Sequence, residues 1–369
     1  MLCLAGGAPA QAPTSNGLNA DFAALAARAE AAREADRPDE AIVLYQKAVE
    51  LRPGWGEGWW WLGMLEYEGR AFGRSAEAFR KAAALNSKNG TARAMLGLSE
   101  FELGEDASAL KHIQEGKDLG LPDDPQLRNV VLYHEGVLLR RAGMFKEALQ
   151  RLHTLCFSGV QNPDLLQALG MVALWRSEPE ATGDRDVGVV ARVGRAECLA
   201  GQKKFDEARR EYAAAARDYP TYPNIHYAYG WFLLGAEDMP AGYAELEREI
   251  KNNPGHVMAR LQIAATRYKV DSAAGLPYAE EAVKLDPQSM LGHYLLGLLL
   301  LDTDDYLRAI PELETVQKAQ PEFAKAYLAL GAAYARAGRE QDAARARATF
   351  QRLQEAAGKP AELLPEPEQ

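Results

Sequence analysis

Histidine, cysteine and glutamate are the residues of this sequence that could do chemistry near neutral pH, so their spacing is considered first. No two histidines lie three or four positions apart, the spacing that places two metal ligands on one helix face, and no Cys-x-x-Cys motif is present. This pattern favours scattered surface histidines, and we expect no metal and no cofactor. The six histidines are His112, His134, His153, His226, His256 and His293.

Two glutamates, Glu66 and Glu100, hold the same place in neighbouring segments of similar sequence. A close carboxylate pair is a starting point for acid-base catalysis. Ion pairing with nearby arginines or partial exposure is the commoner arrangement of such residues, and we favour it here. No glycine-rich phosphate loop follows a strand pattern. The sequence therefore predicts no catalytic residues, and we do not expect an enzyme.

The overall charge narrows the classes of partner. A formal net charge of -10 and a pI near 5.3 disfavour a surface that binds nucleic acid or anionic lipid. The longest apolar runs, such as Tyr294–Leu301, fall short of the roughly 18 to 20 residues that a membrane-spanning helix needs. We expect neither nucleic-acid binding nor membrane insertion.

The first 20 residues read as a leader. Ala8-Pro9-Ala10 fits the small-residue pattern of a secretory cleavage site, but the basic segment of a signal peptide is missing. An export signal shortened by a late start and a plain disordered leader both explain this, and we favour a periplasmic or secreted bacterial protein over a cytoplasmic one. Cys156 and Cys198 either pair in an oxidising compartment or lie buried as small hydrophobes, which we favour.

An internal period of about 34 residues runs through the chain. A pattern of small, aromatic, small and proline residues recurs, at Ala41, Tyr45, Ala48 and Pro53, with the same spacing at Ser75, Phe79, Ala82 and Ser87, and again at Ala208, Tyr212, Ala215 and Pro220. A glycine series accompanies it, at Gly63, Gly97, Gly136, Gly170, Gly230, Gly297 and Gly331. Glycine inside a helix is destabilising, so close helix packing must require it. Each period therefore predicts two packed helices.

These segments resemble the tetratricopeptide repeat family. The runs "WWWLGMLEYEGRAFGRSAEAFRKAAAL" and "AKAYLALGAAYARAGREQDAARA" carry the bulky, Leu-Gly, aromatic, alanine and proline order of that family's helix-turn-helix unit. We count about nine units from Phe22 to Leu353. The resemblance implies an all-α, right-handed solenoid that binds other proteins.

Composition divides this array into segments. Residues 1–20 are the leader, 21–176 an N-terminal array, 189–354 a C-terminal array with a capping helix, and 355–369 an acidic tail. Between the arrays, residues 177–188 contain proline, glycine and many charged residues where a helix should lie, so we expect an irregular loop there.

The run Trp59-Trp60-Trp61 needs three different neighbours, because consecutive helical side chains lie about 100° apart. Trp59 should face the partner helix of its own hairpin and Trp61 a neighbouring hairpin. The third sector corresponds to the inner, concave surface of the resembling family. At that phase lies a set of apolar and aromatic side chains that we call the aromatic row: Trp60, Met64, Tyr67, Leu98, Phe101, Tyr133, Val137, Tyr227, Trp231, Tyr294 and Leu298.

We hypothesise that the aromatic row forms a groove for an apolar peptide or helix of a partner protein. The competing interpretation is that its side chains cover one another in the core. Well-understood family members bind acidic peptide tails through basic and amide side chains, whereas here the matching positions carry Ala26, Glu30, Trp61, Thr91 and Met95. The predicted function is a non-catalytic interaction scaffold. The alternatives are an accessory factor of a secretion or envelope-assembly complex that docks through its outer face or edges, and then an RNA-binding repeat or an enzyme.

Overall fold

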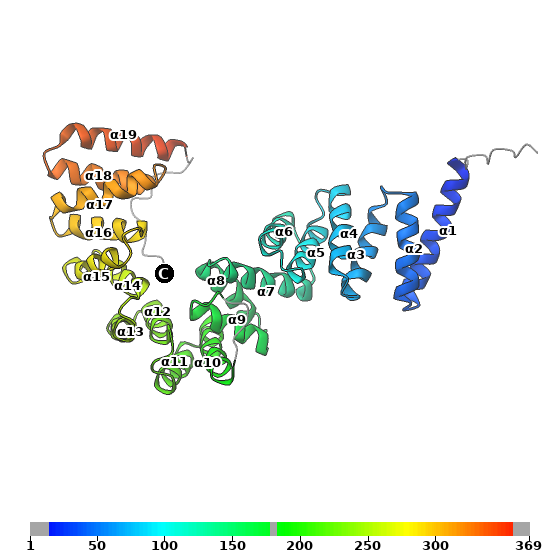
Figure 1. Ribbon diagram of the computed structural model, residues 1–369, viewed down its shortest axis with the longest axis horizontal. Helices are drawn as coiled ribbons and strands as arrows, with labels where there is room; N and C mark the ends of the chain where they lie inside the picture. Colours follow the sequence, from blue (N-terminus) through cyan, green and yellow to red (C-terminus); the bar gives the residue numbers. More distant parts are fainter. Residues whose placement is uncertain (1–14, 178–182, 357–369) are drawn as a thin grey trace, which may run out of the picture. The chain divides into compact units, whose positions relative to one another are not determined.

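The fold is entirely helical in a computed structural model that describes residues 15–177 and 183–356 (Figure 1). Within these two ranges the chain forms nineteen α-helices and no strand. The all-α fold class is therefore confirmed, and nineteen helices are enough for about nine hairpins.

The chain divides into two compact units. Unit 1 comprises residues 1–187 with 200–203, and unit 2 comprises residues 188–199 with 204–369. The helices of unit 1 are α1 (Ser15–Glu34), α2 (Pro38–Leu51), α3 (Gly56–Glu68), α4 (Phe72–Leu85), α5 (Gly90–Glu102), α6 (Asp106–Leu119), α7 (Pro125–Arg141), α8 (Phe145–Phe157) and α9 (Pro163–Ala173).

Helix α10 (Asp184–Gly201) contributes residues to both units. The helices of unit 2 are α11 (Phe205–Asp218), α12 (Ile225–Gly235), α13 (Met239–Asn252), α14 (Val257–Arg267), α15 (Ser272–Leu285), α16 (Met290–Asp302), α17 (Tyr306–Ala319), α18 (Ala324–Arg336) and α19 (Glu340–Ala356).

The ends of the predicted segments differ from the structure in three places. Helix α10 begins at Asp184, so the last part of the predicted loop 177–188 is helical, with Asp186 paired to Arg176 at 2.5 Å. The charged residues of this segment suggested a loop. An exposed helix face carries the same residue types, so they do not distinguish the two structures. Helix α1 begins at Ser15, inside the predicted leader, and α19 ends at Ala356, inside the predicted tail. Residues 1–14, 178–182 and 357–369 lie outside the described residues.

Consecutive helices pair as antiparallel hairpins, such as α3 with α4 and α5 with α6 (Figure 1). In α4 the side chains of Ser75, Phe79 and Ala82 recur on one face and are buried. The turn after α3 contains Arg70 in the left-handed region, at φ 58°, and the turn after α5 contains Gly104 at φ 76°. The amphipathic pattern and these short turns together produce the stacked helix pairs.

The repeated glycines mark the points of closest helix approach. A Cβ atom on Gly63 would lie 2.8 Å from the Phe79 ring. At Gly97 it would lie 2.8 Å from the carbonyl oxygen of Ala109, in the backbone of the facing helix. The predicted need for glycine is thus a steric requirement of the hairpin.

The three consecutive tryptophans make different contacts but share part of their surroundings, since Trp59 packs against one buried cluster with Trp61 and against another with Trp60. Trp59 donates from Nε1 to the carbonyl oxygen of Pro53 at 2.8 Å. Trp60 makes an edge contact with Phe79, with 5.4 Å between ring centroids. Trp61 lies under the guanidinium of Arg33 in α1, 4.0 Å from its ring centroid, and so faces the neighbouring hairpin as predicted.

Both cysteines of the described chain are buried. Burial was the favoured interpretation, but the structure also has Cys156 and Cys198 each in the oxidised, disulfide-bonded form. Among residues 15–177 and 183–356, none of the helices has the length and apolarity of a membrane span.

Candidate functional site

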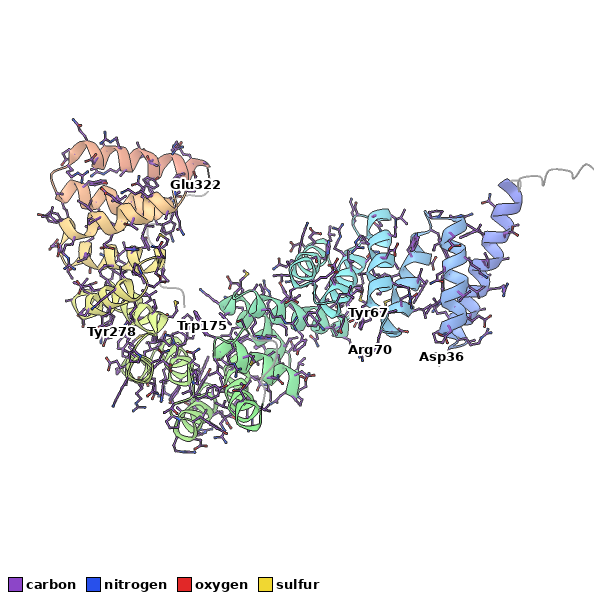
Figure 2. All side chains as sticks on the ribbon, in the orientation of Figure 1. Asp36, Tyr67, Arg70, Trp175, Tyr278 and Glu322 are labelled. Carbon is purple, nitrogen blue, oxygen red and sulfur yellow. The ribbon has the colours of Figure 1, made fainter. Side chains whose placement is uncertain are left out.

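The half-buried part of the aromatic row lies mainly in unit 1. Trp60, Met64 and Tyr67 on α3 and Phe101 on α5 all pack against one buried cluster that includes Phe79 and Leu98. None of these four side chains is fully buried, and each therefore keeps part of its surface in contact with solvent. Tyr67 is labelled in Figure 2, and its ring also makes an edge contact with Phe72 at 5.5 Å.

The row continues through a histidine that the sequence did not single out. His134 on α7 lies between Phe101 and Tyr133, with ring centroids 4.6 Å and 5.3 Å away. Burial lowers the pKa of His134, and its Nδ1 lies 2.7 Å from the carbonyl oxygen of Val130. Arg141 covers the other end of this group, 4.8 Å from the Phe101 ring centroid. Phe101, His134 and Tyr133 therefore form a continuous set of aromatic contacts across α5 and α7.

A cavity of about 550 Å³ adjoins Trp60. We call it the Trp60 cavity; its apolar wall is formed by the indole with Ala82 and Pro122. The polar part of its lining comes from Gly56, Glu57, Asn86, Asn89 and Thr91. Amide and hydroxyl groups around one large apolar surface can bind a segment that presents both a side chain and unpaired backbone groups.

Five members of the aromatic row belong to the core. Leu98, Val137, Tyr227, Tyr294 and Leu298 are buried, and Tyr227 is 0% exposed. Their place in an open groove is a wrong prediction, because side chains with so little exposed surface cannot line a groove for a partner. The competing interpretation, that members of the row cover one another, holds for these five.

In unit 2, Trp231 on α12 is the one member of the aromatic row that is half-buried and not fully buried. Its ring centroid lies 6.2 Å from that of Tyr227, which stacks on His256 at 4.9 Å. Burial raises the pKa of the Tyr227 hydroxyl far above its ordinary value. The unit 2 part of the row is thus mostly packing.

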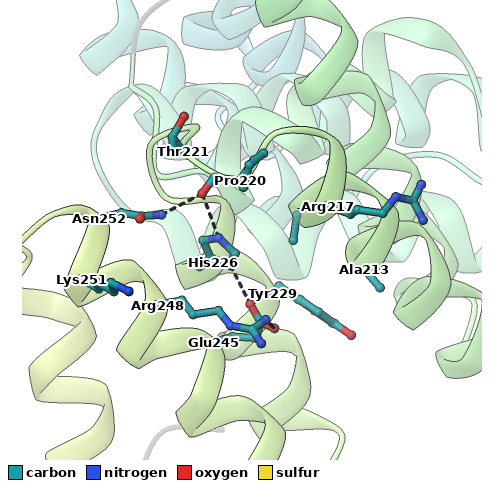
Figure 3. Close-up of a pocket in the computed structure, with 11 residues that line it drawn as sticks. Ala213, Arg217, Pro220, Thr221, His226, Tyr229, Glu245, Arg248, Lys251 and Asn252 are labelled. Carbon is teal, nitrogen blue, oxygen red and sulfur yellow. Dashed lines mark hydrogen bonds and ion pairs between the residues drawn. The ribbon is translucent and has the colours of Figure 1, made fainter.

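Unit 2 instead contains a pocket that sequence reasoning missed (Figure 3). We call this space of about 520 Å³ the His226 pocket. Its lining comes from α11, α12, α13 and the linker between the first two: Ala213, Ala216, Arg217, Pro220, Thr221, His226, Tyr229, Glu245, Arg248, Lys251 and Asn252.

His226 is held from both ring nitrogens. Its Nδ1 lies 2.6 Å from Glu245 Oε2, and its Nε2 lies 3.0 Å from the carbonyl oxygen of Pro220. Both partners are acceptors, so this geometry suits a doubly protonated, charged ring. Burial lowers the pKa of His226, but the hydrogen bond and charge of Glu245 act in the opposite direction and raise it above the ordinary 6.5.

The same arrangement recurs two periods later. His293 has Nδ1 2.6 Å from Glu312 Oε2 and Nε2 3.0 Å from the carbonyl oxygen of Pro287. The expectation of scattered surface histidines is therefore wrong for these two residues, which are buried. The signal was available as a proline six positions before each histidine and a glutamate nineteen positions after it.

His226 predicts a pH dependence of unit 2. Since the pKa of His226 is higher folded than unfolded, its contribution is complete below pH 6.5 and is lost as pH rises through the raised value. We expect the free energy of unfolding to fall by on the order of 1 kcal/mol between pH 6 and pH 9. Fluorine NMR of fluorotryptophan-labelled protein follows unit 2 through Trp231 during urea unfolding. His226→Gln should remove most of this pH dependence, and an unchanged dependence in that variant would contradict the assignment.

The glutamates Glu66 and Glu100 of unit 1 are both ion paired. Glu66 accepts from Arg74 Nε at 2.8 Å, and Glu100 contacts Arg80 Nη2 at 3.4 Å and His112 Nδ1 at 2.6 Å. Of the two favoured interpretations of these carboxylates, ion pairing is confirmed and partial exposure is wrong, since Glu66 and Glu100 are both buried. In the part of the chain that the structure describes, no group of three or more histidine, cysteine, aspartate or glutamate side chains could hold a metal ion.

Comparison with known proteins bears on the family. No curated protein matches the sequence. Among solved structures, MamA 41-end from Desulfovibrio magneticus RS-1 is 22% identical, over 48% of this chain and 100% of that chain, with a TM-score of 0.43. Yeast Tom70 is 15% identical, over 91% of this chain and 70% of that chain, with a TM-score of 0.34. These likenesses are too distant to carry an argument about a partner.

The family model for the tetratricopeptide repeat matches residues 62–120, 193–257 and 294–360, just over half of the chain. The matched regions lie in both units, and the helices within them pair as hairpins with the repeated glycine at their contact. The chain belongs to the tetratricopeptide repeat family.

Proposed function

We propose that the protein is a non-catalytic scaffold whose unit 1 binds an extended, apolar segment of another protein beside Trp60. Tetratricopeptide repeats support a protein-interaction scaffold, and such scaffolds are generally non-catalytic. The observation that carries the finer proposal is the Trp60 cavity, at the start of the half-buried part of the aromatic row.

The lining of the cavity favours an extended segment over a helix. Oδ1 of Asn86 and of Asn89 already accepts from a backbone N–H group, so their amide N–H groups and the Thr91 hydroxyl remain for a ligand. A bound helix satisfies its own backbone and would leave these groups without ligand partners. An extended segment presents backbone N–H and C=O groups to them while one apolar side chain covers the Trp60 indole. Of the two ligand forms expected from sequence, we therefore propose the extended peptide.

Selection of peptides from a displayed random library on the full chain tests this proposal. We expect apolar peptides to be enriched, and Trp60→Ala to weaken their binding at least about 30-fold, since buried aromatic anchors contribute about 2 kcal/mol or more to binding. Trp61→Ala is the matched control, because Trp61 packs under Arg33 and lies outside the cavity. Equal binding by wild type and Trp60→Ala, or equal losses in both variants, would overturn the proposal.

A second mode, docking through an edge, is favoured by one observation in unit 2. Val270 is 84% exposed in the turn between α14 and α15, and Leu307 is 70% exposed as the second residue of α17. Ser272 Oγ donates to Asp302 at 2.6 Å, which holds the turn of Val270 against the end of α16. If capture of apolar peptides depends on Val270 and Leu307 and not on Trp60, the binding site is this edge and not the Trp60 cavity. Substitution of both residues by aspartate distinguishes the two.

A further inference from the structure

A second pocket of unit 2, of about 340 Å³, is lined by the amino end of α11 and the carboxyl end of α12. We call it the Phe205 pocket. Its lining includes the Phe205 ring, which is 50% exposed, and the buried Phe232 ring, which stacks on Tyr212 with 5.1 Å between centroids. The pocket therefore offers an accessible aromatic surface on a rigid support.

The charged side chains at this pocket are mostly acidic. Asp206 and Glu237 line it, and both are exposed. Arg209 also lines it and acts on Asp206 by its charge, but its Nη1 donates to Asp238 Oδ2 at 2.8 Å. Three carboxylates thus lie around one guanidinium, which leaves an excess of negative charge. The partial charges of the two helix ends oppose each other, so the side chains decide the sign of the pocket.

Elsewhere in unit 2, an aromatic ring and a carboxylate together hold an arginine. Arg339 lies over the Tyr334 ring, 4.4 Å from its centroid, and donates from Nε to Asp342 Oδ2 at 2.6 Å. A second set comprises Arg267, with the Tyr243 ring centroid at 4.3 Å and Asp271 Oδ2 at 3.1 Å. A guanidinium is suited to both contacts at once, because its face stacks on a ring while its edge donates hydrogen bonds.

The Phe205 ring has acidic neighbours but no cation over it. This holds for the part of the chain that the structure describes. At the same place in an earlier hairpin, Phe72 has Arg70 of the preceding turn 5.9 Å from its centroid. Lys203 holds the corresponding place before Phe205, but it lies over the Phe157 ring at 5.8 Å. The Phe205 pocket thus has the ring and the carboxylates of the arginine sites and lacks the guanidinium.

We propose that the Phe205 pocket binds an arginine side chain of a partner protein. The guanidinium would stack on the Phe205 ring and donate to Asp206 and Glu237, whose charge it complements. A lysine ammonium is a compact point charge and lacks the planar surface for stacking. The volume of about 340 Å³ is at the lower end of the range of about 300–1,000 Å³ typical of ligand sites, so it suits one side chain.

This site is separate from the one proposed for apolar segments. No member of the aromatic row lines the Phe205 pocket, and the Trp60 cavity lies in unit 1. The inference rests on the proposed scaffold function only in taking the arginine to belong to a protein.

The test is selection of displayed random octapeptides on the full chain, followed by binding of the best arginine-containing peptide, made with blocked ends. We expect arginine to be enriched among the selected peptides. Asp206→Asn with Glu237→Gln should weaken binding about 10-fold or more, because two charge-assisted contacts are lost. Phe205→Leu keeps an apolar side chain but removes the ring, and should weaken binding about 2- to 5-fold.

The matched control for the charge variant is Asp36→Asn with Asp39→Asn. Asp36 lies in a hairpin turn in the left-handed region, at φ 53°, as Glu237 does at φ 62°. Asp39 is the second residue of α2, as Asp206 is of α11. Both control aspartates are exposed and lie outside the pocket, so the control removes the same formal charge from an acidic chain. It should bind the arginine peptide as wild type does.

Several outcomes would overturn the inference. They are no enrichment of arginine, undiminished binding when citrulline or lysine replaces the arginine, and an equal loss in the aspartate control. Trp60→Ala should leave this binding intact, and a loss in that variant would place the arginine peptide in the Trp60 cavity. The arginine peptide should not compete with apolar peptides bound beside Trp60, so failure of this inference is distinguishable from failure of the proposed function.

Discussion

Replacing Lys117 and Arg151 by methionine is expected to destabilise unit 1 by about 3–5 kcal/mol, because the double variant strands a buried carboxylate. Glu135 is 1% exposed. Its Oε2 accepts from Lys117 Nζ at 2.5 Å, and its Oε1 lies 3.2 Å from Arg151 Nε. The two cations come from α6 and α8, so the carboxylate on α7 links successive hairpins.

A triple variant makes this expectation specific. Adding Glu135→Met to the two methionines removes the stranded charge and should recover most of the lost free energy of unfolding, since buried ion pairs are often replaceable by apolar side chains. Urea unfolding, followed by fluorine NMR of labelled Trp60, reports on unit 1. A double variant within 1 kcal/mol of wild type, or a triple variant less stable than the double, would show that Glu135 does not depend on these cations.

The second large effect concerns replacement of two glycines of the same series by alanine. We expect the two substitutions to change the free energy of unfolding in opposite directions. Gly97→Ala should destabilise unit 1 by about 1–3 kcal/mol, because the added Cβ would lie 2.8 Å from the backbone oxygen of Ala109. Two helices must then move apart. The known gain from alanine in a helix, up to about 1 kcal/mol, is smaller than this steric cost.

Gly331→Ala is the matched comparison. There the nearest atom is Cγ of the flexible Arg347 side chain at 3.2 Å, and the facing backbone oxygen of Ala343 lies 3.8 Å away. We expect Gly331→Ala to be neutral or to stabilise unit 2 by up to about 1 kcal/mol. Urea unfolding of each variant against wild type checks the pair, and destabilisation by both would show that glycine serves more than close packing at position 331.

These predictions depend on neighbours that the period alone does not identify. Gly97 and Gly331 are equivalent in sequence, yet one faces backbone and the other a mobile side chain. Likewise Glu66 and Glu100 were expected to find arginines, but the link from Lys117 through Glu135 to Arg151 could not be deduced, because its members lie on three different helices.

The aromatic row was also predicted only in part from the sequence. Helical phase placed Trp60, Met64 and Tyr67 together, and the structure does put them on one buried cluster. Phase also included Tyr227, which the structure buries completely. Phase specifies the direction of a side chain from its own helix, whereas exposure depends on what the neighbouring helices place over it.

The His226 pocket required coordinates for another reason. Arg217 and Lys251 are 34 positions apart, one repeat, and each looks like an ordinary surface cation in the sequence. Both line one pocket because α11 and α13 border it, together with a histidine held by Glu245.

The sequence by itself determined the all-α class, the hairpin unit and the family, because a short period repeated many times is a local pattern. Only the tertiary structure decided which aromatic side chains remain accessible, which charges pair and where cavities lie. Those properties arise from contacts between separate helices, and small changes in packing from one repeat to the next alter them without changing the repeat itself.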